Sequence, residues 1–432
     1  MLSYYFTLAL RSYRRNVALS ALMVAAIGVG IGTSMTVLTV LIAMSGDPIP
    51  AKSSRLFNVQ IDNWGAAARS ANGEPVDQLS YRDSNALAQA RRAPRQTAMY
   101  GVALTVTPTV ADQEPFAIEG RAANADFFAM FSPPFRFGGA WGAAEDEGRA
   151  NVVVLGSKLA QRLFRDEDPV GRSVSLDQRD YRVLGVLNRW ELQPRFYDVI
   201  GDAYAETEDV FVPFTTAIDR QMPLLRNDNC NKAPATPGWL GHLNSECVWT
   251  QFWVELPAAD VSEYRAFLDG YAAEQRRAGR FDWAPVTRLR NVREWLVYKE
   301  VVSDEIRVTT LLAFGFFVVC MVNVVGLMLA KFSSRAREIG VRRALGASRS
   351  DVFQQCMVES SVVGLGGGLL GVLLTALGLM VERAILPDNT ARLAQMDPGI
   401  VALTLTLAVL ASLCAGLYPT WRASRVRSAW QL

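Results

Sequence analysis

The sequence predicts a membrane protein with four transmembrane helices and one large α+β domain outside the membrane. Half of its 432 residues are hydrophobic, yet a fifth are charged, and the mean hydropathy is only +0.13. This mixture is typical of a chain with a few membrane spans and a sizeable folded soluble part. Four long apolar runs, with a long polar segment between the first and the second, support this division.

Each apolar run is long enough to cross a bilayer, which requires roughly 20 apolar residues in a helix. We expect transmembrane helices at residues 17–45, 307–331, 356–381 and 399–421. A buried soluble helix can mimic one such run, but four of them make that explanation improbable. The first run is too long for the core of a cleaved signal peptide. It also follows residues 1–16, which we interpret as an amphipathic segment at the membrane surface.

The placement of Lys and Arg predicts the orientation of the spans. These residues gather in segment 1–16, in loop 332–355 and in tail 422–432. The stretch from Gly46 to Arg307, by contrast, contains 36 acidic and 30 basic residues. The positive-inside rule therefore places both termini and loop 332–355 in the cytoplasm. Domain 46–306 and the short loop 382–398 are expected on the other side of the membrane.

The spans contain closely spaced glycines, which permit close approach between helix backbones. They are Gly28, Gly30 and Gly32 in the first span and Gly364, Gly366, Gly367, Gly368 and Gly371 in the third. Glu359 is the carboxylate nearest to a span interior, about two turns into a helix that starts near Ser350. We expect it to pair with an arginine on the cytoplasmic side and not to belong to an ion path.

The large domain alternates strand-like and helix-like segments, which predicts an α+β fold of two lobes. Strands are expected at Leu56–Ile61, Met99–Pro108, Val152–Leu155, Tyr181–Leu187 and Phe252–Leu256. Helices are expected at Ser80–Arg92, Ser157–Arg165 and Ala258–Ala278. The segment Asn291–Arg307 is expected to be a helix that runs directly into the second span and connects it rigidly to the domain.

The loop 220–250 is rich in Pro, Gly and Asn and is bracketed by Cys230 and Cys247. Outside the cytoplasm we expect these cysteines to form a disulfide, which would stabilise the domain by about 3 kcal/mol. Trp239, Trp249 and Trp253 would either contact a partner or pack under the loop. Because the chain has no CxxC pair and a single histidine, His242, we expect neither a metal site nor a histidine-based catalytic centre.

The loop 334–359 is too short for a domain and reads as two short helical segments. Gly346 is expected to end the first, and Ser348 with Asp351 forms a capping box for the next. Nearly continuous helical geometry would place Val341, Leu345, Val352 and Cys356 on one face. Such a basic helix either docks into a groove on another protein or rests on anionic lipid headgroups, and physical chemistry alone favours neither.

The run Arg337-Glu338-Ile339-Gly340-Val341-Arg342-Arg343-Ala344-Leu345-Gly346-Ala347, followed by Glu359-Ser360, resembles the hallmark of FtsX-like permeases of the MacB type. Further resemblances lie at Ala9-Leu10-Arg11-Ser12 with Arg15-Asn16, at Asp168-Pro169-Val170-Gly171, at Tyr181–Val186 and at Tyr418–Ser424. Together they cover nearly the whole chain. One departure is Ser428, where the family usually has a proline.

The resemblance implies the permease subunit of an ABC transporter, which works as a dimer with an identical or a similar second chain. The loop would be a coupling helix on a nucleotide-binding subunit, with contacts from Arg337, Glu338, Ile339, Gly340, Arg342, Arg343, Gly346 and Arg349. Glu359 would be a carboxylate at the membrane interface. Since no G-x-x-x-x-G-K-[ST] motif occurs, we expect ATP and Mg²⁺ to bind a separate ATPase subunit. No cofactor, catalytic residue or nucleic-acid partner is expected in this chain.

The family suggests several functions for the large domain. The leading one is efflux of a peptide, antibiotic or similar compound, driven by mechanotransmission through the spans, with a periplasmic adaptor and an outer-membrane channel. Release of lipoproteins from the membrane and control of a cell-wall hydrolase are the alternatives. A membrane enzyme is poorly supported because only His242 could serve a nucleophile as its base.

Overall fold

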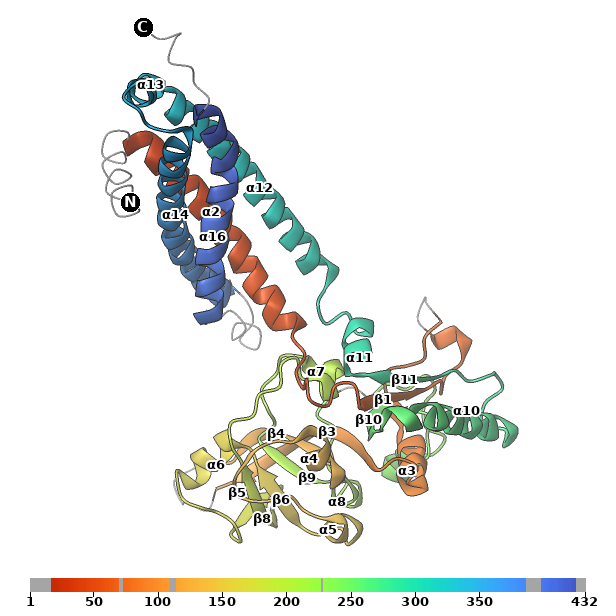
Figure 1. Cartoon of the computed structure of the whole chain (residues 1–432). Coiled ribbons are helices and arrows are strands. Elements are labelled where there is room, and N and C mark those ends of the chain that lie inside the picture. Colours follow the sequence, from red (N-terminus) through yellow and green to blue (C-terminus); the bar gives the residue numbers. More distant parts are fainter. Residues whose placement is uncertain (1–16, 70–72, 109–113, 227, 386–397, 425–432) are drawn as a thin grey trace. The chain divides into compact units, whose positions relative to one another are not determined.

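The computed structural model describes residues 17–69, 73–108, 114–226, 228–385 and 398–424. Chain contacts divide the protein into a membrane unit, Met1–Ser45 with Val302–Leu432, and an extramembrane domain, Gly46–Val301 (Figure 1). The predicted segment 1–16, most of loop 382–398 and most of tail 422–432 lie outside the described residues.

Four helices in the described part of the membrane unit are long and apolar enough to span a bilayer, which confirms the predicted architecture. They are α2 (Val17–Ser45), α12 (Asp304–Ser333), α14 (Arg349–Ile385) and α16 (Pro398–Ser424). α2 packs against α12 and α14, and α14 also packs against α16. α14 begins at Arg349, next to the helix start expected near Ser350, and so extends about two turns before the predicted span 356–381.

Glycines bring α2 and α14 close together, as predicted. A Cβ atom at Gly28 would lie 2.7 Å from side-chain carbons of Leu370, and one at Gly32 would lie 2.7 Å from the Cβ of Leu374. Such distances leave no room for a larger residue unless the helices separate. The glycine spacing therefore sets the α2–α14 contact.

One mixed sheet runs through the extramembrane domain, and its described strands follow the order β11-β1-β10-β3-β4-β9-β6-β8-β5. Most neighbours are antiparallel, whereas β4–β9 and β6–β8 are parallel. The described part of the domain forms one compact unit around this sheet, and its division into two lobes stays a prediction. The strands are β1 (Leu56–Ile61), β2 (Leu79–Ser80), β3 (Arg95–Thr107), β4 (Phe116–Ala123), β5 (Phe135–Gly138), β6 (Val152–Leu155), β7 (Ser173–Leu176), β8 (Arg179–Leu187), β9 (Val210–Pro213), β10 (Val248–Glu255) and β11 (Thr287–Asn291).

Short helices connect and cover these strands. They are α3 (Tyr81–Ala90), α4 (Asp126–Phe131), α5 (Ala143–Glu147), α6 (Ser157–Phe164), α7 (Val199–Asp202), α8 (Phe214–Asp219), α9 (Gly238–Leu243), α10 (Val261–Arg277) and α11 (Val292–Tyr298), with 3₁₀ turns η1 (Ala66–Ala68), η2 (Phe196–Asp198) and η3 (Ala258–Asp260). α3 begins where Ser80 caps it by accepting a hydrogen bond from the Asp83 amide. All three predicted helices of the domain are present.

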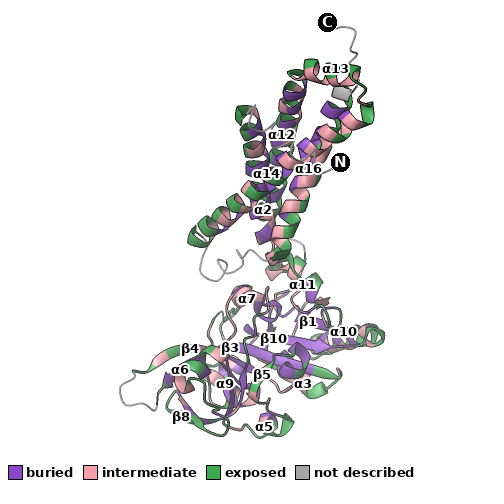
Figure 2. Cartoon of the chain, turned by 60° about the vertical axis from the view of Figure 1, so that its left-hand side comes forward, coloured by how far each residue is buried: buried purple, intermediate pink, exposed green. Residues whose placement is uncertain are grey.

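The sheet separates two hydrophobic cores, one on each face. Phe252 and Val254 belong to the first core and Trp253 to the second, because side chains alternate between the faces along a strand. The buried colour in Figure 2 follows these central strands. Trp249 and Trp253 are both buried. They therefore pack inside the domain, and Trp239 packs, partly buried, against the first core.

The prediction of one continuous helix over Asn291–Arg307 is wrong. α11 ends at Tyr298, and α12 begins only at Asp304. The break has two causes: Glu300 adopts a left-handed conformation with φ +48°, and Ser303 caps α12 by accepting a hydrogen bond from the Ile306 amide. The domain is therefore connected to α12 through a non-helical segment.

Candidate functional site

Helix α13 (Ala336–Ala344) forms the centre of the loop between α12 and α14. Its C-terminus is closed by two backbone bonds, from Gly346 N to Arg343 O (3.2 Å) and from Ala347 N to Arg342 O (3.1 Å). This pair of bonds is a Schellman motif and requires the left-handed conformation that Gly346 adopts at φ +103°. Ser348 and Asp351 then form the predicted capping box. The predicted end of the first helix and start of the next are both confirmed.

The inner face of α13 is fixed to the membrane unit. Arg342 donates to Glu338 on its own helix (2.8 Å) and to Gln355 on α14 (2.9 Å). Ile339 packs against the hydrophobic core of the spans. Glu338, Ile339 and Arg342, which were predicted to contact an ATPase, therefore also hold α13 in place.

The outer face of α13 carries an exposed stripe, formed by Arg337, Val341, Ala344 and Leu345. These positions are spaced as neighbours on one side of a helix. Leu345 is 83% exposed and Val341 is 57% exposed, although both are apolar. Sequence reasoning had not singled out these two as contact residues, although their i, i+4 spacing was a signal.

The prediction that Val341 and Leu345 share a face with Val352 and Cys356 is wrong. Val352 is 4% and Cys356 5% exposed, in the core of the membrane unit. The turn at Gly346 separates the two helices, so helical periodicity does not continue through it. Among the other predicted contact residues, Gly340 and Arg343 are half-buried and Arg349 is exposed at the start of α14.

A buried ion cluster lies beside α13. Glu359 of α14 pairs with Lys331 of α12 (2.6 Å) and with Arg335 (3.1 Å), which occupies the N-cap position of α13. Lys331 also donates to Ser20 of α2 (3.2 Å) and is only 1% exposed. The predicted pairing of Glu359 with an arginine is therefore present. Sequence reasoning had counted Lys331 only as a topology signal, yet it connects three of the spans.

A second buried ion cluster lies inside the extramembrane domain. The Arg121 guanidinium, which is fully buried, donates to Glu208 (2.6 Å) and contacts Asp198. Arg195 pairs with the same two carboxylates, each at 3.2 Å. Burial alone would raise the pKa of Glu208, but the positive charges of Arg121 and Arg195 outweigh it and lower that pKa to about 2. Glu208 therefore stays ionised, and the cluster connects β4 to the segment that leads into β9.

A cleft of about 610 Å³ opens between α3, α4, α5 and α8. Three carboxylates line it, those of Asp126, Asp146 and Glu147, and an ion pair between Glu147 and Arg91 connects two of its walls. Burial raises the pKa of Asp146, although hydrogen bonds from Asn124 and the Ala125 amide oppose the shift. The lining is acidic overall, and alanines with Phe214 supply its apolar part.

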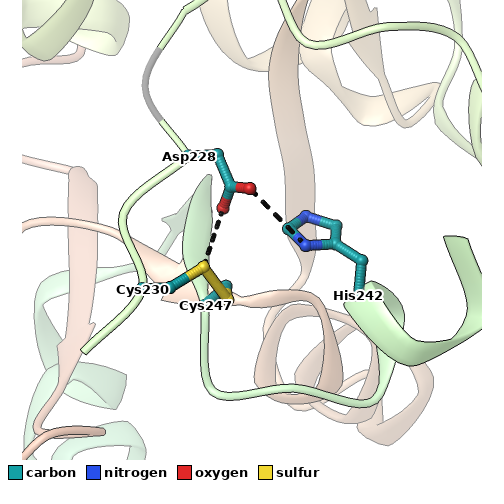
Figure 3. A group of neighbouring side chains, drawn as sticks. All are labelled: Asp228, Cys230, His242 and Cys247. Carbon is teal, nitrogen blue, oxygen red and sulfur yellow. Dashed lines mark hydrogen bonds and ion pairs between the residues drawn. A yellow bond between two sulfur atoms is a disulfide. The ribbon is translucent and has the colours of Figure 1, made fainter. Parts of the chain in front are cut away.

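The structure contains the predicted disulfide between Cys230 and Cys247, which confirms that prediction. Asp228 and His242 lie beside it (Figure 3). Asp228 was not singled out from the sequence, because nothing in the loop's composition shows that its carboxylate would meet the disulfide. The expectation of no metal site rested on the missing CxxC pair and the single histidine, and neither observation shows which distant residues the fold brings together.

Comparison with known proteins gives two family matches. Residues 20–263 match the MacB-like periplasmic core domain, and residues 310–427 match the FtsX-like permease C-terminal region. The macrolide export ATP-binding/permease protein MacB of Salmonella paratyphi A is 26% identical over 310 residues, which cover 72% of this chain and 42% of that protein. MacB of Escherichia coli O157:H7 is 27% identical over 320 residues, with the same coverage.

The chain thus spans less than half the length of the curated relatives it matches. Among solved structures, the periplasmic region of MacB from Actinobacillus actinomycetemcomitans aligns with a TM-score of 0.36 and 14% identity over 56% of this chain and 92% of that one. The first family match alone spans more than half of the sequence. The chain therefore belongs to the family of FtsX-like ABC permeases with a MacB-like periplasmic core domain.

Proposed function

We propose that this chain is the permease subunit of an ABC transporter and that a separate nucleotide-binding subunit docks on α13. The observation that carries the proposal is the exposed stripe of α13. Val341 and Leu345 extend into solvent between Arg337 and Arg349, while the opposite face of the helix is bonded to α14. Exposed apolar side chains with a charged rim are typical of a protein-binding surface.

The stripe suits the way in which amphipathic helices bind grooves on other proteins. A helix presents anchors at i, i+4 and i+7 or i+8, and the anchors near the centre of the contact carry most of the binding energy. Counted from Arg337, the residues Val341, Ala344 and Leu345 lie at i+4, i+7 and i+8 and therefore have this spacing. The competing explanation is that the basic helix rests on lipid headgroups. A helix with that role would not need an inner face that is bonded to α14, as the inner face of α13 is.

The ion cluster around Glu359 provides a route by which motion of α13 would reach the spans. Arg335 directly precedes α13 and pairs with Glu359 of α14, and Glu359 in turn pairs with Lys331 of α12. A displacement of α13 that kept these pairs would carry the cytoplasmic ends of α12 and α14 with it. In this mechanism ATP and Mg²⁺ bind the partner subunit, and the chain itself contributes no catalytic residue.

The membrane arrangement follows from the charges. We propose that α13 and both termini lie in the cytoplasm and that domain 46–301 lies in the periplasm, because the basic residues flank the spans on the α13 side. The functional unit would be a dimer with a second permease chain, identical or similar. Conformational change would then pass from the ATPase through the spans to the domain.

The substrate side of the proposal is efflux of a peptide, antibiotic or similar compound, with an adaptor protein and an outer-membrane channel. The acidic lining of the cleft favours the binding of a cationic compound. Its carboxylates outnumber its arginine, and its volume is within the range of about 300–1,000 Å³ that is usual for ligand sites.

Site-specific photo-crosslinking in the native membrane tests the docking. A crosslinker in place of Leu345 is expected to capture a protein that contains a G-x-x-x-x-G-K-[ST] phosphate-binding loop. The control is the same crosslinker in place of Leu240, an exposed leucine of the extramembrane domain at 74% exposure. Capture of lipid alone at position 345 would support the headgroup explanation and contradict the docking proposal.

A further inference from the structure

We propose that the Cys230–Cys247 disulfide masks a zinc site, which forms when the disulfide is reduced. The ligands would be the two thiolates, one nitrogen of His242 and one carboxylate oxygen of Asp228. Cys₂His sites completed by a fourth ligand are common for zinc. The proposal does not depend on the ATPase docking or on the transport function.

The four side chains already converge on one point (Figure 3). Their ligand atoms all lie within 4.8 Å of one another. Asp228 connects the group, with Oδ1 3.4 Å from the Cys230 Sγ and Oδ2 3.6 Å from the His242 Nδ1. In a tetrahedral zinc site with bonds of about 2.0 to 2.3 Å, neighbouring ligand atoms are about 3.3 to 3.8 Å apart. Cleavage of the disulfide and small side-chain movements would therefore be enough.

The backbone around the site is held by contacts that do not need the disulfide. Asn229 and Val248 exchange two backbone hydrogen bonds, at 2.9 and 3.3 Å, so Asp228 and Cys230 stay beside the start of β10. Cys247 itself belongs to the hydrophobic core. The ligands on both sides of the site would thus remain near each other after reduction.

The His242 ring is held separately, by α9. Ser245 Oγ donates to the His242 carbonyl at 2.7 Å, and Trp239 Nε1, on the same helix, donates to the Ile218 carbonyl at 3.0 Å. The imidazole packs against Trp249 with ring centroids 5.4 Å apart, and against Trp239 at 5.9 Å. These contacts orient the ring so that its Nδ1 atom faces Asp228.

Formation of the zinc site requires a dithiol reductant that first cleaves the disulfide. A dithiol reductant attacks the disulfide, transfers two electrons to it and becomes a disulfide itself, while Cys230 and Cys247 become thiols. Zn²⁺ then binds their sulfur atoms as thiolates and releases two protons to solvent. Zinc stabilises the reduced loop, because the metal replaces the covalent bond as its crosslink. In the oxidised state the sulfur atoms are not thiolates and the site is closed.

Cobalt binding to the full-length protein in detergent tests the proposal. Cys320, Cys356 and Cys414 are replaced by serine, so that Cys230 and Cys247 are the remaining cysteines. After anaerobic reduction with a phosphine, Co²⁺ is titrated and its thiolate charge-transfer and visible bands are recorded. One equivalent is expected to bind reduced protein and none to bind oxidised protein. Zn²⁺ should displace the cobalt and abolish both bands.

Ligand variants separate this site from adventitious binding. His242→Ala should weaken cobalt binding by at least about tenfold, since even outer-shell partners of metal sites contribute that much. Asp228→Asn should also weaken it, whereas Asp260→Asn, an acid outside the site, should not. Absence of the bands although two thiols are titratable would overturn the proposal. So would undiminished binding to His242→Ala, or a loss of near-UV circular dichroism on reduction that zinc does not restore.

Discussion

Arg121 and Arg195 are buried charges whose cost is offset by their partners. An isolated buried guanidinium would be strongly destabilising, but Glu208 and Asp198 each contact both arginines, so the four charges neutralise one another. Tyr197 adds a hydrogen bond to Glu208 at 2.9 Å. The cluster therefore fixes how β4 meets the segment before β9, and it is sensitive to the loss of any single member.

We expect Glu208→Gln to destabilise the domain by about 3 to 5 kcal/mol, because it leaves an uncompensated positive charge in the interior. The free energy of unfolding can be measured on the full-length protein in detergent, by denaturant titration followed by tryptophan fluorescence. Most of the ten tryptophans lie between Trp64 and Trp295, so the signal reports on the domain. Glu147→Gln removes an exposed ion pair with Arg91 and should cost about 1 kcal/mol or less.

The same cluster predicts a pH dependence. The pKa of Glu208 is lowered from 4.5 to about 2 in the folded state. A depressed carboxyl pKa stabilises the fold above the unfolded-state pKa, and this contribution is lost as pH falls through the folded value. The stability difference between the native protein and Glu208→Gln should therefore hold above about pH 4.5 and shrink toward pH 2. A constant difference across that range would contradict the assignment.

At the scale of elements, the position of α13 depends on the turn at its C-terminus. Gly346 holds the Schellman turn at φ +103°, and no atom lies within 4 Å of a Cβ built there. Gly346→Ala should thus cost only backbone strain, about 1 to 2 kcal/mol. Gly346→Pro should cost more, because proline fixes φ near −65° and removes the amide that bonds to Arg343.

We predict that Gly346→Pro abolishes stimulation of the partner ATPase while the protein remains in the membrane, and that Gly346→Ala weakens it. Stimulated ATP hydrolysis and membrane content of the protein are the two measurements. Gly270→Ala, in the exposed helix α10 with open space around it, is the control and should change neither. Full stimulation by the proline variant would show that the position of α13 is irrelevant to coupling.

Elements with strong local patterns could be predicted from the sequence. The strands Leu56–Ile61 and Val152–Leu155 have the predicted bounds. The second is a continuous apolar run, whereas the first alternates apolar residues with Asn58 and Gln60. The helix expected over Asn291–Arg307 was wrong because its break rests on the left-handed conformation of Glu300, which no residue type there signals. Charge and helical periodicity predicted the helix in loop 332–355. They did not predict which face of that helix packs against α14.

The residues of the candidate sites were predictable only where a local sequence pattern marked them. Glu359 stood out because carboxylates are rare in spans, but Lys331, Arg121 and Arg195 did not, because sequence patterns treat charged residues as exposed. Their burial depends on partners that are distant in the chain. The disulfide was predictable because both cysteines bracket one loop, whereas the meeting of Asp228 with His242 depends on tertiary folding.

At the scale of the whole molecule, the chain consists of two compact units. Segment 299–303 between α11 and α12 is not helical, and each unit has its own hydrophobic core. We therefore expect the two units to unfold separately. Cooperative two-state unfolding is a property of single domains, and chains with several units depart from it.

Removal of the disulfide tests this independence. Cys230→Ser with Cys247→Ser should destabilise the domain by about 3 kcal/mol, seen as an earlier fluorescence transition. The helical circular dichroism transition of the spans should stay where it was. Cys414→Ser, outside the disulfide, serves as the control. An equal shift of both transitions would show that the units unfold as one.

The most direct test of the coupling account is ATP hydrolysis by the cognate nucleotide-binding subunit, reconstituted with this chain in lipid vesicles. Val341→Asp with Leu345→Asp replaces the exposed apolar anchors of α13 and leaves its bonds to α14 intact. Loss of central anchors should cost about 2 kcal/mol or more of docking energy. Hydrolysis is predicted to fall to the rate of the ATPase alone, and undiminished stimulation by this variant would contradict the account.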